Sequence, residues 1–140
     1  MLYPCLFVII AVIELNNTLC SIMPPTILII DDDEAILVLL EDLLEESGQV
    51  VTHQSPVAAL EWLQHNPPPS LALVDLMMPI LNGKQLIQRL RADERYHNLP
   101  ILVVTASAEN RDTVEQFGIQ GYIRKPFDFK NLRTEVERWL

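Results

Sequence analysis

The sequence has few cysteines, no basic residue before position 84 and no apolar run long enough to cross a bilayer. Its two cysteines, Cys5 and Cys20, are poor evidence for a disulfide or a metal site. All 10 Lys and Arg follow residue 83, and the 19 Asp and Glu bring the formal net charge to −9. Because no basic face for a phosphate backbone is visible, direct binding to nucleic acid is disfavoured.

Residues 1–22 differ in composition from the rest of the chain. The stretch 2–13 is almost wholly apolar but shorter than a transmembrane helix, so we expect no insertion across a membrane. A secretory signal fits badly, because no Lys or Arg precedes this stretch and no Ala-x-Ala site follows it. Our hypothesis is that Met23 is the true start, with residues 23–140 as one domain and residues 1–22 as an upstream reading or a dispensable tail. An anchor at a membrane surface is the weaker alternative.

From Thr26 onward, short apolar runs alternate with longer segments of helical periodicity. The expected strands are 26–31, 50–53, 71–75, 101–105 and 122–124, and the expected helices are 34–47, 55–64, 83–95, 111–117 and 129–140. Gly48 stands at a plausible C′ position of the first helix. The strands are apolar throughout instead of alternating, which predicts an α/β fold with a parallel sheet and helices on both faces.

Polar residues gather where these strands end. Asp31 and Asp32 close the first strand, Asp75 the third and Thr105 the fourth, and Lys125 follows the fifth. Each has an ordinary explanation on its own, but open parallel sheets bind ligands beyond the carboxyl ends of their strands. Hard oxygen ligands suit Mg²⁺, which would relieve the acidic repulsion and offset the charge of a phosphoryl group.

Four stretches carry a resemblance to a known family: ILIIDDDEA, LALVDLMMPILNG, ILVVTAS and GYIRKPF. Residues 26–140 resemble the receiver domain of two-component response regulators, of the stand-alone, CheY-like kind. The resemblance implies a flavodoxin-like, doubly wound five-stranded parallel sheet with strand order 2-1-3-4-5. It also implies a regulatory domain that assists only its own phosphorylation and dephosphorylation, and not an enzyme.

The resemblance assigns roles to the acidic residues. Asp75 would be the phosphoacceptor, attacking a phosphohistidine on a partner, and an ionised carboxylate needs no general base for this. Asp31 and Asp32 would hold Mg²⁺ together with Asp75 and the backbone carbonyl of Met77. We expect Asp33 to cap the following helix, although Asp31 and Asp33 could be misread as the metal pair.

Further roles follow for residues near the later strands. Lys125 would pair with the phosphoryl oxygens, and Thr105 would hydrogen-bond one of them. The Lys125–Pro126 bond would be cis. Tyr122 stands where the family has its switching aromatic, which moves inward with Thr105 on phosphorylation. Because Met77 and Ser107, beside the path of attacking water, offer no amide or carboxylate, we expect a long-lived phosphoryl group.

Two other readings stay open. One is a haloacid-dehalogenase-like phosphatase, because Asp31-x-Asp33 after an apolar strand also fits that family's nucleophile loop; it would need a later acidic motif, for which Asp128 alone is available. The other is a receiver used only for docking, against which the retained acidic cluster argues. The three histidines, His53, His65 and His97, match no metal-ligand spacing and are expected to be ordinary residues.

The expected partners follow from the same resemblance. A sensor histidine kinase or a histidine phosphotransfer protein would donate the phosphoryl group. With only one helix after Lys125, output would pass through protein contact or onward phosphotransfer. The kinase's need for ATP implies a cytoplasmic location.

Overall fold

The computed structural model describes residues 7–15, 23–107 and 111–140. Cys5 and Cys20 lie outside these ranges. Residues 7–15 form a helix in which every residue is exposed. Across the described ranges, no helix has the length and apolarity needed to cross a membrane.

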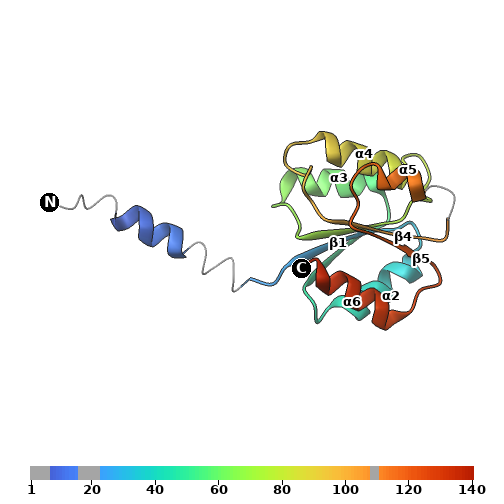
Figure 1. Cartoon of the computed structure of the whole chain (residues 1–140), viewed down its shortest axis with the longest axis horizontal. Helices are drawn as coiled ribbons and strands as arrows, with labels where there is room; N and C mark the ends of the chain where they lie inside the picture. The colour runs from blue at the N-terminus through green and yellow to red at the C-terminus, as the bar shows by residue number, and fades with distance from the viewer. Residues whose placement is uncertain (1–6, 16–22, 108–110) are drawn as a thin grey trace.

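A five-stranded parallel sheet forms the centre of the molecule (Figure 1). Its strands are β1 (Thr26–Ile30), β2 (Gln49–His53), β3 (Leu71–Val74), β4 (Ile101–Thr105) and β5 (Gly121–Arg124). They are ordered β2-β1-β3-β4-β5, and every neighbouring pair is parallel. The predicted flavodoxin-like, doubly wound α/β fold and its strand order are confirmed.

Helices cover both faces of the sheet. They are α2 (Glu34–Leu44), α3 (Pro56–His65), α4 (Gly83–Ala92), α5 (Arg111–Glu115) and α6 (Phe129–Arg138). Figure 1 shows α3, α4 and α5 on one face and α2 and α6 on the other. This arrangement explains why the central strands are apolar throughout: alternate side chains of each strand point to opposite faces, and both faces are covered.

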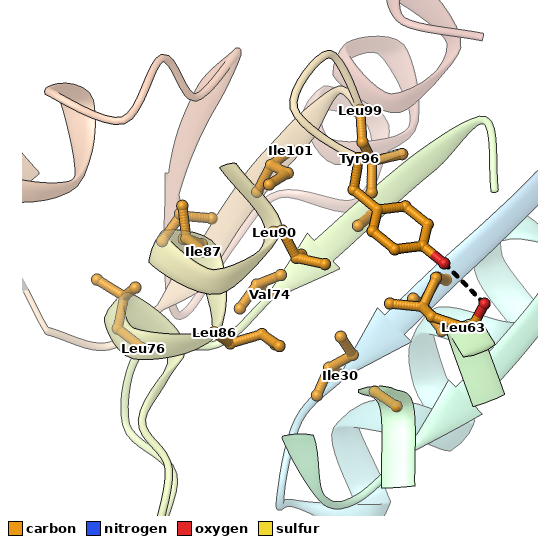
Figure 2. Packing of buried hydrophobic residues seen from close by; sticks show 14 of the residues in the cluster. Ile30, Leu63, Val74, Leu76, Leu86, Ile87, Leu90, Tyr96, Leu99 and Ile101 are labelled. Atoms are coloured by element: carbon orange, nitrogen blue, oxygen red, sulfur yellow. Dashed lines mark hydrogen bonds between the residues drawn. The ribbon is translucent and has the colours of Figure 1, made fainter. Parts of the chain in front are cut away.

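Two hydrophobic cores result, one on each face. Leu28 and Ile30 belong to the core with α3 and α4, whereas Ile27 and Ile29 belong to the core with α2 and α6. In the first core, shown in Figure 2, the Tyr96 hydroxyl donates a hydrogen bond to the Leu63 carbonyl at 2.7 Å. Burying each large aliphatic side chain contributes about 1.5–3 kcal/mol, so the cores fix the sheet and thereby its carboxyl edge.

Capping residues fix where three of the helices begin. The Ser55 hydroxyl accepts hydrogen bonds from the first turn of α3, and Asp128 does the same for α6. Asn82 and Gln85 form a reciprocal capping box at the start of α4. Because these starts follow β2, β3 and β5, the caps also fix the loops at the carboxyl edge of the sheet.

Several expected boundaries differ by a few residues. Helix α2 ends at Leu44, whereas the expected helix continued to residue 47. Helix α4 ends at Ala92 because Asp93 adopts an extended backbone. The C′ role of Gly48 was wrong, since this glycine lies four residues beyond the helix and has no positive φ. A Cβ at position 48 would lie 2.4 Å from the Pro25 carbonyl oxygen, so close backbone approach is what requires glycine there.

Candidate functional site

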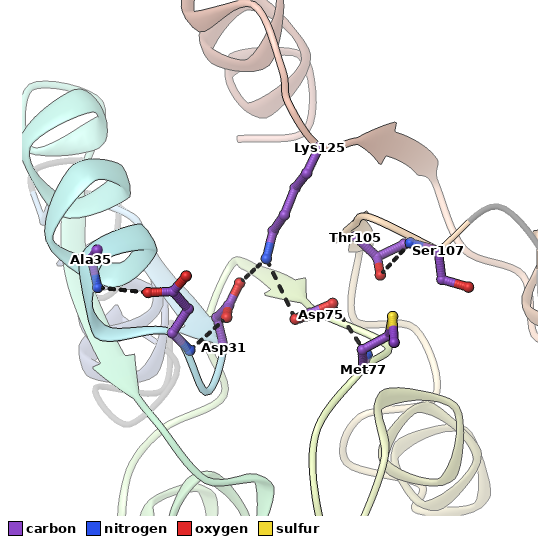
Figure 3. Close-up of polar contacts among 8 residues, drawn as sticks. Asp31, Ala35, Asp75, Met77, Thr105, Ser107 and Lys125 are labelled. Atoms are coloured by element: carbon purple, nitrogen blue, oxygen red, sulfur yellow. Dashed lines mark hydrogen bonds and ion pairs between the residues drawn. The ribbon is translucent and has the colours of Figure 1, made fainter.

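The carboxyl edge of the sheet brings together the polar residues expected there (Figure 3). Asp31 follows β1, Asp75 follows β3, Thr105 ends β4 and Lys125 follows β5. The backbone N–H of Asp31 donates to the His53 carbonyl at 3.2 Å, and that of Asp75 donates to the Ile30 carbonyl at 3.0 Å. These bonds extend the strand pairing by one residue, which holds both acids in place.

Burial distinguishes these groups from ordinary surface residues. Asp31 is 2% exposed, Asp75 is 6% exposed and Thr105 is fully buried. Buried ionisable groups are rare unless they are paired or hold a metal. The surrounding fold therefore maintains this cluster against a desolvation penalty.

Lys125 joins the two buried acids. Its Nζ lies 2.5 Å from Asp31 Oδ2 and 3.4 Å from Asp75 Oδ2. Burial disfavours the ammonium, but the hydrogen bond and charge of Asp31, together with Asp75, outweigh it and raise the pKa of Lys125. Burial also disfavours the charged form of Asp31 and so raises its pKa, although hydrogen bonds from Lys125 and the Asp33 N–H act in the opposite direction. Lys125 thus favours the ionised form of Asp31 but does not cancel the effect of burial, and the pKa of Asp31 stays above its ordinary value.

Three carboxylates are placed to hold a metal ion. One oxygen each from Asp31, Asp32 and Asp75 lies within 4.8 Å of the others, and Asp32 is exposed to solvent. A set of carboxylate oxygens open to water suits Mg²⁺, which keeps several waters and binds through a few carboxylates. Asp33 points elsewhere: its side chain accepts from the Ala35 N–H at 3.0 Å, so its predicted role as the cap of α2 is confirmed.

A second chain of contacts leads away from the acids. The Thr105 hydroxyl accepts from the Ser107 N–H at 3.3 Å, and the Tyr122 hydroxyl donates to the Ser107 carbonyl. Tyr122 is partly buried against the core of α3 and α4, and burial raises its pKa. The Arg111 guanidinium lies over the Tyr122 ring, 5.5 Å from its centroid. Thr105 and Tyr122, predicted to act together, thus share Ser107 as a neighbour.

Three further backbone features lie at this edge. The Lys125–Pro126 bond is cis, as the resemblance implied. Ile80, after Asp75, has φ 70° although it is not glycine, a feature that no sequence pattern had indicated. The His53 backbone carbonyl accepts a hydrogen bond from the Asp31 N–H, a contact that no sequence pattern had indicated.

The histidine side chains lie apart from the acidic cluster. The His65 and His97 rings contact only backbone carbonyls of their own segments among the contacts described, at 2.9 and 2.7 Å. The His53 ring lies against Trp62, with 6.1 Å between ring centroids. These placements agree with the expectation that the histidines are ordinary residues.

Comparison with known proteins places these features in a family. The sequence model described as "Response regulator receiver domain" matches residues 27–137. The chain is 34% identical over 105 residues to the response regulator Rre1 of Synechocystis, covering 72% of this chain and 45% of that protein. It is also 34% identical over 104 residues to the chemotaxis protein CheY of Pseudomonas aeruginosa, covering 71% of this chain and 83% of that protein. The chain therefore spans less than half of Rre1 and most of CheY.

Solved structures agree with the sequence matches. A sensor protein from Polaromonas superposes with a TM-score of 0.75 at 33% identity, covering 81% of this chain and 94% of that one. The Vibrio cholerae protein CheY4 gives 0.76 at 26% identity, with 84% and 99% covered. The response regulator TrrA of Thermotoga maritima, solved in complex with Mg²⁺ and BeF, gives 0.74 at 26%, with 83% and 99% covered.

These matches coincide with the fold and with the edge at which the acids meet. They favour neither a dehalogenase-like phosphatase nor a receiver used only for docking, and the matched family is regulatory. The chain belongs to the response regulator receiver domain family of two-component signalling.

Proposed function

We propose that Asp75 accepts the phosphoryl group in this receiver domain, with Mg²⁺ held by Asp31, Asp32 and Asp75. The observation that carries the proposal is the joint placement of the Asp75 carboxylate: 3.4 Å from Lys125 and within 4.8 Å of oxygens of Asp31 and Asp32. The description of TrrA as a complex with Mg²⁺ and BeF supports the same cation here. The backbone carbonyl of Met77 is proposed as a further ligand.

The proposed reaction moves a phosphoryl group from a histidine nitrogen of the donor to Asp75. A carboxylate oxygen of Asp75 attacks phosphorus, the phosphorus–nitrogen bond breaks, and the imidazole retains the electron pair. When bound, the cation offsets negative charge on the phosphoryl oxygens. Lys125 pairs with another of these oxygens and the Thr105 hydroxyl donates a hydrogen bond to a third, so alignment and charge neutralisation are the main contributions.

Phosphorylation is then read through Thr105 and Tyr122. A phosphoryl group adds about −1.5 to −2 charges at Asp75 and attracts the Thr105 hydroxyl. Because Ser107 is hydrogen-bonded to both residues, movement of Thr105 alters the hydrogen bond that the Tyr122 hydroxyl donates to the Ser107 carbonyl. Tyr122→Ala is expected to leave phosphorylation of Asp75 intact and to remove the difference in partner affinity between the two states.

The proposed donor is a sensor histidine kinase or a histidine phosphotransfer protein, and the output partner is another protein. Relatives of this chain include the hybrid signal transduction histidine kinase D of Dictyostelium, which supports a donor of that class. We place the reaction in the cytoplasm, where kinases have ATP, and assign it to residues 23–140. No catalysis beyond the domain's own phosphorylation and dephosphorylation is proposed.

The proposal is tested by incubating the protein with acetyl phosphate and Mg²⁺ and separating the products on a phosphate-affinity gel. The parent chain should give a retarded band, and Asp75→Asn should give none. Asp42→Asn, which changes an exposed acid on α2, is the matched control and should behave as the parent. Equal retardation of Asp75→Asn and the parent would contradict the assignment.

A further inference from the structure

The loop between β3 and α4 contains an isoleucine whose backbone conformation and solvent exposure are both unfavourable. Ile80 has φ 70°, the left-handed region in which a β-branched residue is strained, and it is 98% exposed. Asn or Gly at this position would avoid both the strain and the exposed apolar surface. Strained residues persist where the surrounding structure holds them, and they concentrate at functional sites.

The loop holds Ile80 in this position from both ends. At one end, the Met77 N–H donates to Asp75 Oδ1 at 3.2 Å (Figure 3), and at the other Asn82 caps α4. Between them, the Leu81 N–H donates to the Pro79 carbonyl at 2.8 Å. The exposure of Ile80 is therefore set by a bonded loop.

The apolar side chains of this loop divide into two groups. Leu76, Met78 and Leu81 point inward and are 5–7% exposed. Met77 and Ile80 point outward and are 61% and 98% exposed. We call this outward pair the loop patch. Met77 lies two residues after Asp75 and its N–H donates to the Asp75 carboxylate, so the patch begins beside the proposed phosphoacceptor.

We propose that the loop patch is a contact surface for the protein that donates the phosphoryl group to Asp75, and that it receives an apolar side chain next to the donor's histidine. The inference rests on the proposed function. Asp75 is only 6% exposed, so a histidine that reaches it brings the surrounding donor surface against the loop. A small donor such as acetyl phosphate reaches Asp75 without covering Ile80.

Charge favours a donor protein over a second copy of this chain. The net charge is −9, and the Met77 N–H donates to the Asp75 carboxylate, which has oxygens of Asp31 and Asp32 within 4.8 Å. Two such edges placed face to face would bring like charges together, which is unfavourable. The patch therefore fits a partner that combines an apolar contact with a less acidic surface.

The experiment compares Ile80→Asn with Ile80→Leu, which keeps the apolar side chain. Met23→Asn is the control for losing an exposed apolar residue elsewhere, since Met23 precedes β1 at the opposite edge of the sheet and is 70% exposed. Histidine kinases of the source organism are autophosphorylated with radiolabelled ATP, and the kinase that transfers fastest to the parent chain is the probe. Rates with acetyl phosphate are measured in parallel.

With the kinase as donor, Ile80→Asn should accept phosphate about tenfold more slowly than the parent, because one well-packed apolar contact is worth about that factor. Ile80→Leu and Met23→Asn should accept at the parent rate. With acetyl phosphate, all four proteins should react equally. Ile80→Asn should also unfold at a temperature about 3 °C higher or more, because Asn tolerates the left-handed region; this shows that the slower transfer does not come from misfolding.

Equal kinase transfer rates for Ile80→Asn and the parent would overturn the loop patch while leaving Asp75 as the phosphoacceptor. Transfer from no kinase of the panel to the parent would overturn it as well, since a donor surface requires a donor. Concentration-dependent dimerisation of the parent that Ile80→Asn abolishes, with unchanged kinase transfer, would assign the patch to a second copy instead. Failure of acetyl phosphate to label Asp75 in any of the proteins would reject the proposed function itself.

Discussion

Lys125 lies closer to Asp31 than to the proposed phosphoacceptor, at 2.5 Å against 3.4 Å. In this arrangement the ammonium neutralises an acid that is also a proposed metal ligand. Lysine and metal therefore compete for Asp31, and binding of one weakens binding of the other.

Replacing Lys125 with Met is expected to tighten Mg²⁺ binding by about tenfold or more, because removing a buried charge that opposes the ion has effects of at least this size. Isothermal titration calorimetry measures the dissociation constant directly. Arg124→Met is the matched control, since Arg124 is the exposed neighbour of Lys125 and should change affinity much less. Equal effects of the two substitutions would show that Lys125 affects Mg²⁺ binding only through its charge and not through its contact with Asp31.

His53 should make stability depend on pH. Burial lowers its pKa below the ordinary 6.5, so the unfolded chain takes up a proton more readily than the folded one. The contribution to stability is fully present above pH 6.5 and is lost as the pH falls from there through the folded pKa. In agreement, His53 Nε2 is buried and has no hydrogen-bond partner among the described residues.

The prediction is checked by urea unfolding at about pH 7.5 and about pH 5.5, a range that brackets histidine titration. The parent should lose more unfolding free energy between the two values than His53→Phe, which keeps an aromatic ring against Trp62. A parallel decline in the two proteins would show that His53 does not contribute.

Single residues also show what sequence can and cannot predict. The sequence predicts that four residues lie together, because parallel strands place their carboxyl ends at one edge of the sheet. These are Asp31, Asp75, Thr105 and Lys125. The preference of Lys125 for Asp31 could not be predicted, since it depends on where a long flexible side chain ends.

At the scale of the elements, the start of α4 is fitted against the strand end that carries Asp75. A Cβ on Gly83 would lie 2.1 Å from the Asp75 carbonyl oxygen and 2.7 Å from the Leu76 Cα. The Gly83 N–H donates to the Leu76 carbonyl at 3.1 Å. The helix start therefore lies in direct backbone contact with the strand end, with no room for a side chain at position 83.

Gly83→Ala is expected to lower the unfolding free energy by roughly 2–3 kcal/mol, because the methyl group forces two backbone segments apart. Urea denaturation monitored by circular dichroism measures the change. Gln88→Ala, at an exposed position of α4, is the control and should change little. A Gly83→Ala protein as stable as the control would show that the loop adjusts freely.

Element boundaries were less predictable than element types. The central strands could be predicted because they are apolar throughout. The start of α3 could be predicted from Ser55 as its cap and Pro56 as its first residue. The end of α2 was placed too late, because Gly48 suggested a helix cap although it serves close packing against Pro25. Sequence shows that glycine is needed at a position but not which contact requires it.

At the scale of the whole molecule, the family match covers residues 27–137 and the two cores use residues from Ile27 to Val136. Residues 7–15 form a helix whose residues are all exposed and belong to neither core. The domain boundary at Met23 remains our proposal, and a shortened chain tests it.

Removing residues 1–22 is expected to leave the unfolding free energy and acetyl phosphate reactivity unchanged, because the cores and the acidic edge remain complete. Urea denaturation of both lengths checks this, and the intact mass of the natural protein tests whether Met23 is its first residue. A marked loss of stability in the shorter chain would contradict the boundary, and a natural mass matching residues 1–140 would contradict the start at Met23.

The central claim is that Asp75 forms an acyl phosphate in a pocket that needs a divalent cation. Peptide mass mapping after acetyl phosphate treatment, with Mg²⁺ and with the metal chelated, tests it most directly. The account predicts one phosphoryl group, on the peptide containing Asp75, only when Mg²⁺ is present. Phosphate on a different carboxylate, or on none, would contradict it.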